Sequence, residues 1–179
     1  MADPIRLFAE FTDDQGDDWR VNIHDADYTG SEIEFNLGAD GFVLRYSGNN
    51  EDRYQPIIGS EVTFTLTETT SDHTTFMDLL ATAVEQRFSV SIRKDPDGTD
   101  DLWWGGVLYP EQIVRPYDSL PIQNTITAAD DLGNLQAILY DNDGSAYTGA
   151  VSTVDHLLNC FNKTRATHLW GTDDFLYYV

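Results

Sequence analysis

Hydrophobic and polar residues alternate in several stretches of the first 130 positions, a pattern typical of β-strands with one buried face. The clearest case is the predicted strand 88–94, which the acidic stretch 95–101 separates from a second predicted strand, 102–109. Pro96-Asp97-Gly98 within that stretch favours a turn, because each of these residues supports a turn conformation for its own physical reason. We therefore expect a hairpin here, with the apolar residues of 88–92 facing a half-buried core, and neighbouring elements packed around it.

Similar alternation predicts strands elsewhere in the chain. These further strands are expected at 5–11, 19–23, 32–37, 42–46, 54–67 and 122–128. Strands 32–37 and 42–46 should pair with each other, because only the turn-like Gly38-Ala39-Asp40-Gly41 separates them. The proline-bearing stretch 110–121 should cross between elements, because proline cannot donate to a central ladder.

The hydrophobic period changes to that of a helix in two places. The first predicted helix, 72–86, has the apolar stripe Phe76, Leu79, Leu80, Ala83 and Val84, with Ser71, Asp72 or Thr74 as its N-cap. The second, 152–163, begins at Ser152 or Thr153 and has Asp155 in its first turn, where the helix dipole favours an acid.

These elements predict a mainly β (α+β) fold, an antiparallel β-barrel or sandwich with one packed helix. A chain of 179 residues can build one such core. We expect a β-rich domain over 1–149. Residues 150–179, a helix and a short aromatic strand, should start a second domain or form a docking tail.

Composition indicates a folded chain, and its charge disfavours nucleic acid and anionic membranes as binding partners. The chain is 41% apolar and 12% aromatic, but it carries 31 acidic against 10 basic residues, a formal net charge of -21. Such a chain cannot supply the basic surface that binds nucleic acid or anionic membrane. The acids are spread over the predicted loops, which indicates solvated turns. The single cysteine, Cys160, allows no internal disulfide, and no apolar run is long enough to cross a membrane or act as a signal peptide.

Motifs for catalysis or metal binding are incomplete. Neither acidic loop has the ligand spacing of a helix-loop-helix calcium site, and there is no Gly-x-Ser-x-Gly sequence. The histidines His24, His73, His156 and His168 lie in unrelated sequence contexts. His156 and Cys160 are one helical turn apart, but no further residues complete a zinc site. We expect no enzyme activity, no metal and no cofactor.

Four blocks of sequence, in this order, resemble the N-terminal portion of the tail hub (baseplate hub-like) proteins of tailed bacteriophages. They are Pro56-Ile57-Ile58-Gly59-Ser60 with the strand after it, the predicted helix, the run Leu102-Trp103-Trp104-Gly105-Gly106-Val107-Leu108-Tyr109-Pro110-Glu111, and Ile126-Thr127-Ala128-Ala129-Asp130-Asp131-Leu132-Gly133-Asn134-Leu135. Together they cover roughly residues 42–140.

The resemblance implies a structural virion protein of the tail, assembled in the host cytoplasm. Hub proteins of this kind form a trimeric ring that connects the tail tube to the tail tip or spike, and they carry no catalytic residues. Aromatic residues that would be buried only in the ring are the interface candidates: Trp103, Tyr109, Tyr117, Trp170 and Tyr177. The acidic charge would then keep DNA from adhering to the lumen of the ring.

Two alternatives remain open from the sequence. One is a carbohydrate-binding β-sandwich module at a tail tip, with Trp103 and nearby tyrosines lining a sugar groove. The other is a small hydrolase that uses a pair of acids, although 31 acids make any such pairing uninformative.

Overall fold

A computed structural model describes residues 3–47, 59–84, 87–110, 119–130, 132 and 152–161. The expected domain boundary near residue 150, the strand residues 54–58 and the aromatic end 169–179 lie outside this part of the chain. The elements in chain order are β1 (Ile5–Thr12), β2 (Asp18–Asp25), β3 (Ile33–Glu34), β4 (Asn36–Ser47), β5 (Gly59–Glu68), α1 (Ser71–Ala81), β6 (Phe88–Lys94), β7 (Asp101–Leu108), β8 (Ile122–Ala129) and α2 (Thr153–Phe161).

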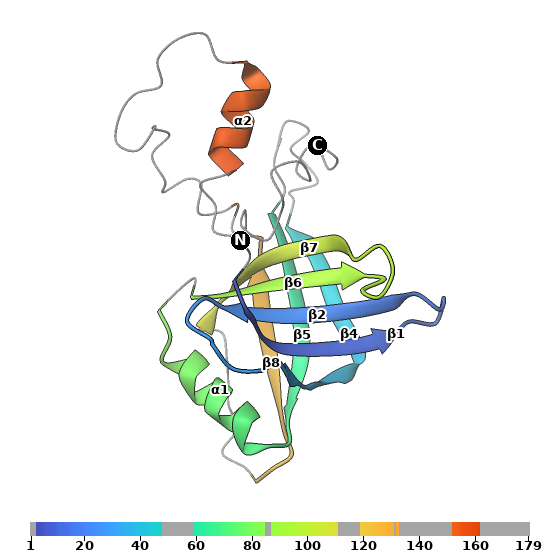
Figure 1. Cartoon of the computed structure of the whole chain (residues 1–179), viewed down its shortest axis with the longest axis vertical. Coiled ribbons are helices and arrows are strands. Elements are labelled where there is room, and N and C mark those ends of the chain that lie inside the picture. Colours follow the sequence, from blue (N-terminus) through green and yellow to red (C-terminus); the bar gives the residue numbers. More distant parts are fainter. Residues whose placement is uncertain are drawn as a thin grey trace.

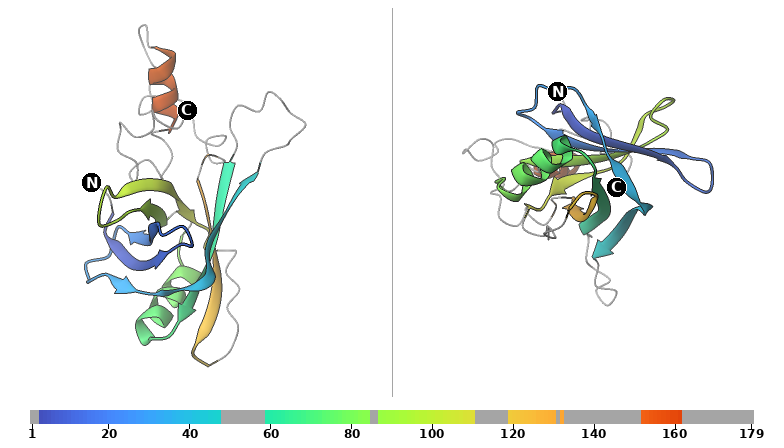
Figure 2. Two further views of the ribbon diagram at one scale, coloured as in Figure 1. Left: turned by 90° about the vertical axis from the view of Figure 1, so that its right-hand side faces the viewer. Right: turned by 90° about the horizontal axis from the view of Figure 1, so that it is seen from below.

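All eight strands belong to one sheet, which curls into a half-barrel. Their order is β3-β1-β2-β6-β7-β8-β5-β4, and the pairs are antiparallel except for β1 with β3. Figure 1 shows β1, β2, β6 and β7 running across β8, β5 and β4, and Figure 2 shows these two groups side-on. The mainly β class with one packed helix, expected from the sequence, is confirmed.

The two outer strands of this sheet are consecutive in the chain. β3 pairs with β1 at one edge, β4 pairs with β5 at the other, and only Phe35 separates β3 from β4. The Phe35 side chain is buried, with its ring centroid 6.2 Å from that of Phe64. Its backbone N–H donates to the Phe8 carbonyl at 2.8 Å. The sheet must therefore curl far enough for its two edges to meet at this residue.

The sheet bends between β7 and β8. These strands share only two paired positions, Val107 with Ala129 and Leu108 with Ala128. Gly106 lies just before them, and a β-carbon there would come within 2.3 Å of the Ala129 carbonyl oxygen and of the Trp104 ring. The backbone of β7 can approach β8 this closely only because residue 106 has no side chain.

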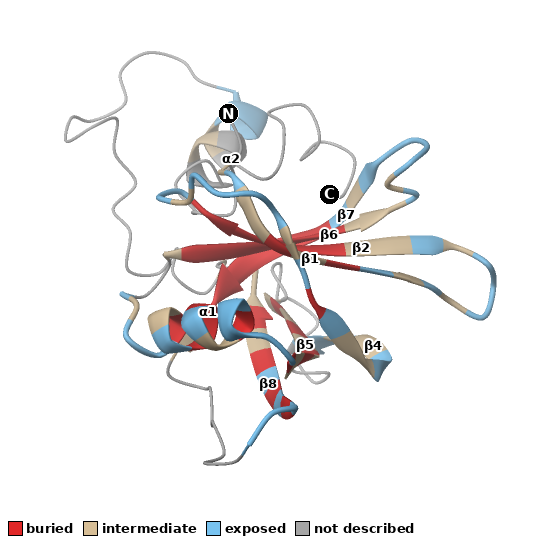
Figure 3. Ribbon diagram, turned by 60° about the horizontal axis from the view of Figure 1, so that its bottom comes forward, coloured by how far each residue is buried: buried red, intermediate tan, exposed pale blue. Residues whose placement is uncertain are grey.

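The core fills the concave side of the sheet, and α1 covers one end of it. Phe76, Met77 and Leu80 of α1 are fully buried, and the Phe76 ring meets Phe88 of β6 edge to face at 5.4 Å. His73 of α1 contacts the Glu34 carbonyl through Nε2 at 2.9 Å, while its Nδ1 accepts from the Thr69 N–H at 3.2 Å. The helix is thereby joined to the residues beside Phe35. Figure 3 shows the buried side of α1 facing the strands.

The pairing expected of 32–37 with 42–46 is wrong. Residues 36–47 form the single strand β4 along β5, and Gly38-Ala39-Asp40-Gly41 bulges outward where Leu37 faces Leu66 and Phe42 faces Phe64. Gly41 has a φ of 60°, which favours glycine. The alternation was read correctly, but the glycine-rich residues extend one strand instead of reversing it.

The helix predicted at 72–86 is shorter and begins earlier. Its N-cap is Thr70, whose hydroxyl accepts from the His73 N–H, and it ends at Ala81. Val84, assigned to the apolar stripe, is 80% exposed. Met77 and His73 are buried although the stripe did not include them.

Two other sequence expectations have clear outcomes. Strand β6 is not half-buried: residues 88–92 are buried on both faces, Ser89 and Ser91 included. The second helix begins as predicted, because the Ser152 hydroxyl accepts from the Asp155 N–H at 3.1 Å.

We predict that Gly106→Ala lowers the free energy of unfolding by about 1–3 kcal/mol. The added methyl group would clash with the backbone of Ala129, so the backbone at the β7–β8 bend must move. Urea unfolding followed by circular dichroism measures this change. Gly98→Ala is the matched control, because a β-carbon there meets only the flexible Asp95 side chain in an exposed turn. Equal stability of both variants would contradict the close approach assigned to Gly106.

Candidate functional site

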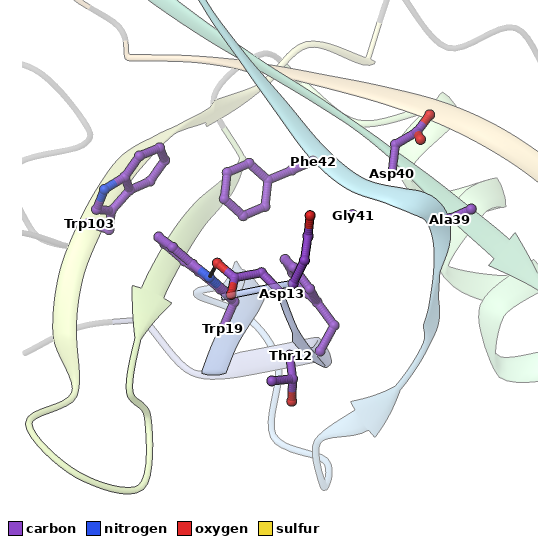
Figure 4. Close-up of a pocket in the computed structure, with 10 residues that line it drawn as sticks. Thr12, Asp13, Trp19, Ala39, Asp40, Gly41, Phe42 and Trp103 are labelled. Atoms are coloured by element: carbon purple, nitrogen blue, oxygen red, sulfur yellow. Dashed lines mark hydrogen bonds between the residues drawn. The ribbon is translucent and has the colours of Figure 1, made fainter. Parts of the chain in front are cut away.

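The end of the half-barrel away from α1 is an open pocket with aromatic walls. Its volume is about 520 Å³, a size typical of ligand pockets. It is formed by the end of β1, the turn into β2, the bulge of β4 and the start of β7 (Figure 4). The lining residues are Phe11, Thr12, Asp13, Asp14, Trp19, Ala39, Asp40, Gly41, Phe42 and Trp103. We call this feature the mouth pocket.

The position of the mouth pocket follows from the two ends of β1. Arg6, near the start of β1, lies over the Phe76 ring of α1 at 5.7 Å. Phe11, near the end of β1, contacts Phe42 of β4 with ring centroids 5.9 Å apart. The α1 end of the core is therefore covered by a helix, whereas the Phe11 end meets solvent.

Four aromatic rings build the wall of the mouth pocket, and most meet edge to face. The Trp19 ring lies 5.5 Å from Phe42 and 5.2 Å from Trp103, with interplanar angles of 72° and 84°. Phe42 and Trp103 are 5.5 Å apart and tilted by 48°. Neighbouring rings held at steep angles present several faces and edges to one space rather than a single flat platform.

Asp13 is fixed as a carboxylate beside this wall. Its Oδ2 accepts from the Trp19 indole N–H at 3.0 Å, and its Oδ1 accepts from the backbone N–H groups of Gln15 and Asp17, both at 2.9 Å. The indole bond first, and then the Asp17 amide, hold the pKa of Asp13 below its ordinary value. Figure 4 shows Asp13 against Trp19, whereas the Asp40 carboxylate points away from the rings.

The two hairpin tips beside the mouth pocket are linked to each other. The Lys94 ammonium of β6 pairs with the Asp17 carboxylate of the β1–β2 turn and lies 5.6 Å from the centre of the Trp19 ring. The Asp17 hydrogen bond raises the pKa of Lys94 above its ordinary value. The Asp95 N–H also donates to the Asp18 carbonyl at 2.8 Å. Both turns are thereby held in place around the aromatic wall.

The structure places two of the five interface candidates. Trp103 is 36% exposed and forms part of the mouth pocket. Tyr109 is half-buried beyond the β7–β8 bend, where its N–H donates to the Thr127 carbonyl at 3.2 Å. Tyr117, Trp170 and Tyr177 lie outside the described residues. The neighbouring Trp104 is a core residue, 5% exposed.

Sequence reasoning missed most of the mouth pocket. Phe11, Trp19 and Phe42 were read only as members of alternating strands, and Asp13 only as a turn acid. The available signal was the position of each aromatic residue next to a turn or a glycine-rich bulge, at strand ends where side chains meet solvent. That these ends converge depends on the sheet order, which the sequence does not reveal.

Two histidines have partners that their sequence contexts did not suggest, His73 at α1 and His24 in β2. The Nε2 of His24 lies 2.8 Å from the Ser91 hydroxyl, and its Nδ1 lies 2.8 Å from the Asp3 carbonyl. Asn22 donates to the same hydroxyl at 3.3 Å. This arrangement resembles a nucleophile with its base, but Ser91 is fully buried in the middle of β6, so no substrate reaches its hydroxyl. The cluster satisfies polar groups buried on the sheet.

No three His, Cys, Asp or Glu side chains of the described ranges come together in a way that could hold a metal ion. His156 lies on α2, and the side chain of Cys160 is outside the described set. Neither helix is long and apolar enough to cross a membrane, as far as the structure describes the chain.

Comparisons of this chain with known protein families, with curated proteins and with solved structures find no match. Its site must therefore be interpreted from its own geometry.

We predict that acid weakens the fold partly through Asp13. A carboxyl whose pKa is lower in the folded chain contributes stability above its unfolded value of about 3.9, and this contribution disappears as the pH falls through the folded value. Asp13→Asn should reduce stability at pH 7 and make the remaining stability less sensitive to pH below about 4. Urea unfolding at pH 7, 4 and 2.5 measures both effects.

Trp19→Phe provides the control, because it removes the largest cause of the shift and keeps the carboxyl. The acid sensitivity of this variant should fall between those of the wild type and Asp13→Asn. Parallel curves for all three proteins would contradict the role of Asp13.

Proposed function

We propose that this chain is a structural, non-enzymatic protein of a phage tail. In this proposal it forms a ring-like hub, a homotrimer in the virion, that connects the tail tube to the tail tip or spike. The proposal rests on the resemblance of four sequence blocks to tail hub proteins, and on how those blocks are used in the fold.

Three of the four blocks meet in one partly buried hydrogen-bond network, and this observation supports the proposal most. The Trp104 indole N–H donates to the Ser60 hydroxyl at 3.0 Å, and that hydroxyl donates to the Asp130 carboxylate at 2.8 Å. The Ser60 backbone N–H also donates to Asp130. These residues come from β7, β5 and the end of β8. The blocks that carry the resemblance therefore contact one another in the fold, although they lie far apart in the sequence.

The remaining block is the helix, and it also has a defined part in the fold. α1 covers one end of the core with Phe76, Met77 and Leu80. Gly106, within the tryptophan block, permits the β7–β8 bend. The blocks thus include the residues at the β7–β8 bend, the helix over one end of the core and the Trp104–Ser60–Asp130 network, so each block has a structural part in this fold.

Strand β4 offers a route to self-assembly. It is twelve residues long and lies at the end of the strand order, with no further strand beside it in the described part of the chain. Val43 and Tyr46 on this strand are 43% and 69% exposed. An edge strand with exposed apolar side chains can pair with another chain, and a closed ring satisfies every such edge.

A carbohydrate-binding module is the second candidate, and one observation favours it. Trp103, which the sequence suggested for a sugar groove, does line a pocket that carboxylates border. The tyrosines expected beside it are not among the lining residues. The steep angles between the rings also leave no single flat platform of the kind on which a sugar ring stacks.

The assembly proposal is tested by light scattering after size exclusion. The wild-type chain should elute as a trimer at micromolar concentration or assemble with tail tube protein. Val43→Lys with Tyr46→Lys should convert it to a folded monomer, because charged side chains on an edge strand block pairing with a second chain. A wild-type chain that stays monomeric and does not bind tail tube protein would contradict the proposal.

Val84→Lys is the matched control. Val84 is 80% exposed but lies after α1, away from β4, so this variant should assemble like the wild type. Unchanged far-UV circular dichroism spectra and cooperative melting of all variants would show that the edge change acts on assembly and not on folding. The monomeric variant should melt somewhat earlier, because it has lost the stabilisation that assembly gives to the folded state.

A further inference from the structure

The mouth pocket has a chemistry that self-assembly alone does not explain. We propose that it binds the guanidinium group of an arginine in a basic segment of a partner protein. This inference goes beyond the hub proposal and does not rest on it, because it concerns only the described lining residues.

The first argument is the shape of the aromatic wall. A cation is attracted to the face of an aromatic ring within about 6 Å, and it gains most where several rings surround it. Trp19, Trp103 and Phe42 pack directly against one another with ring centroids 5.2–5.5 Å apart, so a cation does not fit between them. It would instead lie on the ring surfaces that line the pocket. A volume of about 520 Å³ leaves room for an arginine side chain and its neighbours in the segment.

The second argument is charge. Asp13, Asp14 and Asp40 are the only charged residues among the ten that line the pocket, and all three are acidic. The Trp19 indole and two backbone amides keep Asp13 in place beside the wall, whereas Asp40 points away from the rings. We therefore assign the local negative field to Asp13 and Asp14, within a chain whose net charge is -21.

The third argument is that the chain already places a cation on this wall. The Lys94 ammonium lies 5.6 Å from the centre of the Trp19 ring, held there by Asp17 at the rim of the same end. Arginine fits the pocket better than lysine, because its planar guanidinium stacks on aromatic rings and is more weakly hydrated. A neutral sugar carries no charge, so the negative charge of these carboxylates would not attract it.

The test uses the whole chain labelled with nitrogen-15 and two blocked peptides, Gly-Ser-Arg-Ser-Gly and the same peptide with citrulline in place of arginine. Citrulline keeps the shape of the side chain and removes its charge. The arginine peptide should shift the indole N–H signals of Trp19 and Trp103 and bind at least about fivefold more tightly than the citrulline peptide. Raising the salt from 50 to 500 mM should weaken arginine binding and leave citrulline binding unchanged.

Three variants locate the site. Trp103→Leu and Asp14→Asn should each weaken arginine binding several-fold, whereas Asp78→Asn, an exposed acid on α1 at the other end of the core, should not. The comparison of the two peptides on the wild-type chain decides the question even if a variant fails to fold.

Equal binding of both peptides, or shifts confined to signals other than Trp19 and Trp103, would overturn the proposal. So would a neutral oligosaccharide, such as maltopentaose, that shifts these two signals when the arginine peptide does not. That last result would assign the pocket to carbohydrate.

Discussion

The chain passes from one edge of its sheet to the other through Phe35 alone. A flat sheet of eight strands cannot satisfy this connection, because its outer strands would be far apart. The Phe35 amide bonds to Phe8 of β1, and its ring packs near Phe64 of β5, so one residue is tied to both halves of the sheet. Two other features accompany this curl: Gly106 permits the close approach of β7 to β8, and β4 carries a bulge between Leu37 and Phe42.

The curled sheet has two ends, one covered by α1 and one open to solvent. At one end α1 inserts three buried side chains and His73 joins the helix to Glu34, next to Phe35. At the other end no helix covers the core in the described part of the chain. Aromatic rings and the acidic turn at Asp13 there line a pocket that is open to solvent. Stability is thus concentrated at the covered end and in the sheet, while recognition is available at the mouth pocket and along the edge of β4. This division is compatible with the assembly role proposed above.

The sequence predicted the elements better than it predicted their neighbours. The local residue pattern located β1, β2, β5, β6, β7 and β8, since the order of apolar, polar and turn residues is a local property, although the burial of β2, β6 and β7 does not alternate. It failed at β4, where Gly38 to Gly41 resemble a turn but form a bulge, because turn and bulge draw on the same residues. The mouth pocket could not be predicted from the sequence for a different reason. Its aromatic residues come from four strands and meet only because of the order of the strands in the sheet: Phe11, Trp19, Phe42 and Trp103. Among the residues that line the mouth pocket, Trp103 alone was an interface candidate from the sequence.

Native-state hydrogen exchange of the Phe35 amide tests the closure of the sheet most directly. If Phe35 ties the two edges together, its N–H is released only when the whole fold opens, and its exchange free energy should equal that of Val90 in the middle of β6. Exchange of Phe35 several orders of magnitude faster than that of Val90, in an otherwise folded chain, would contradict the account. It would mean that β3 and β4 separate freely and that the curl does not depend on their connection.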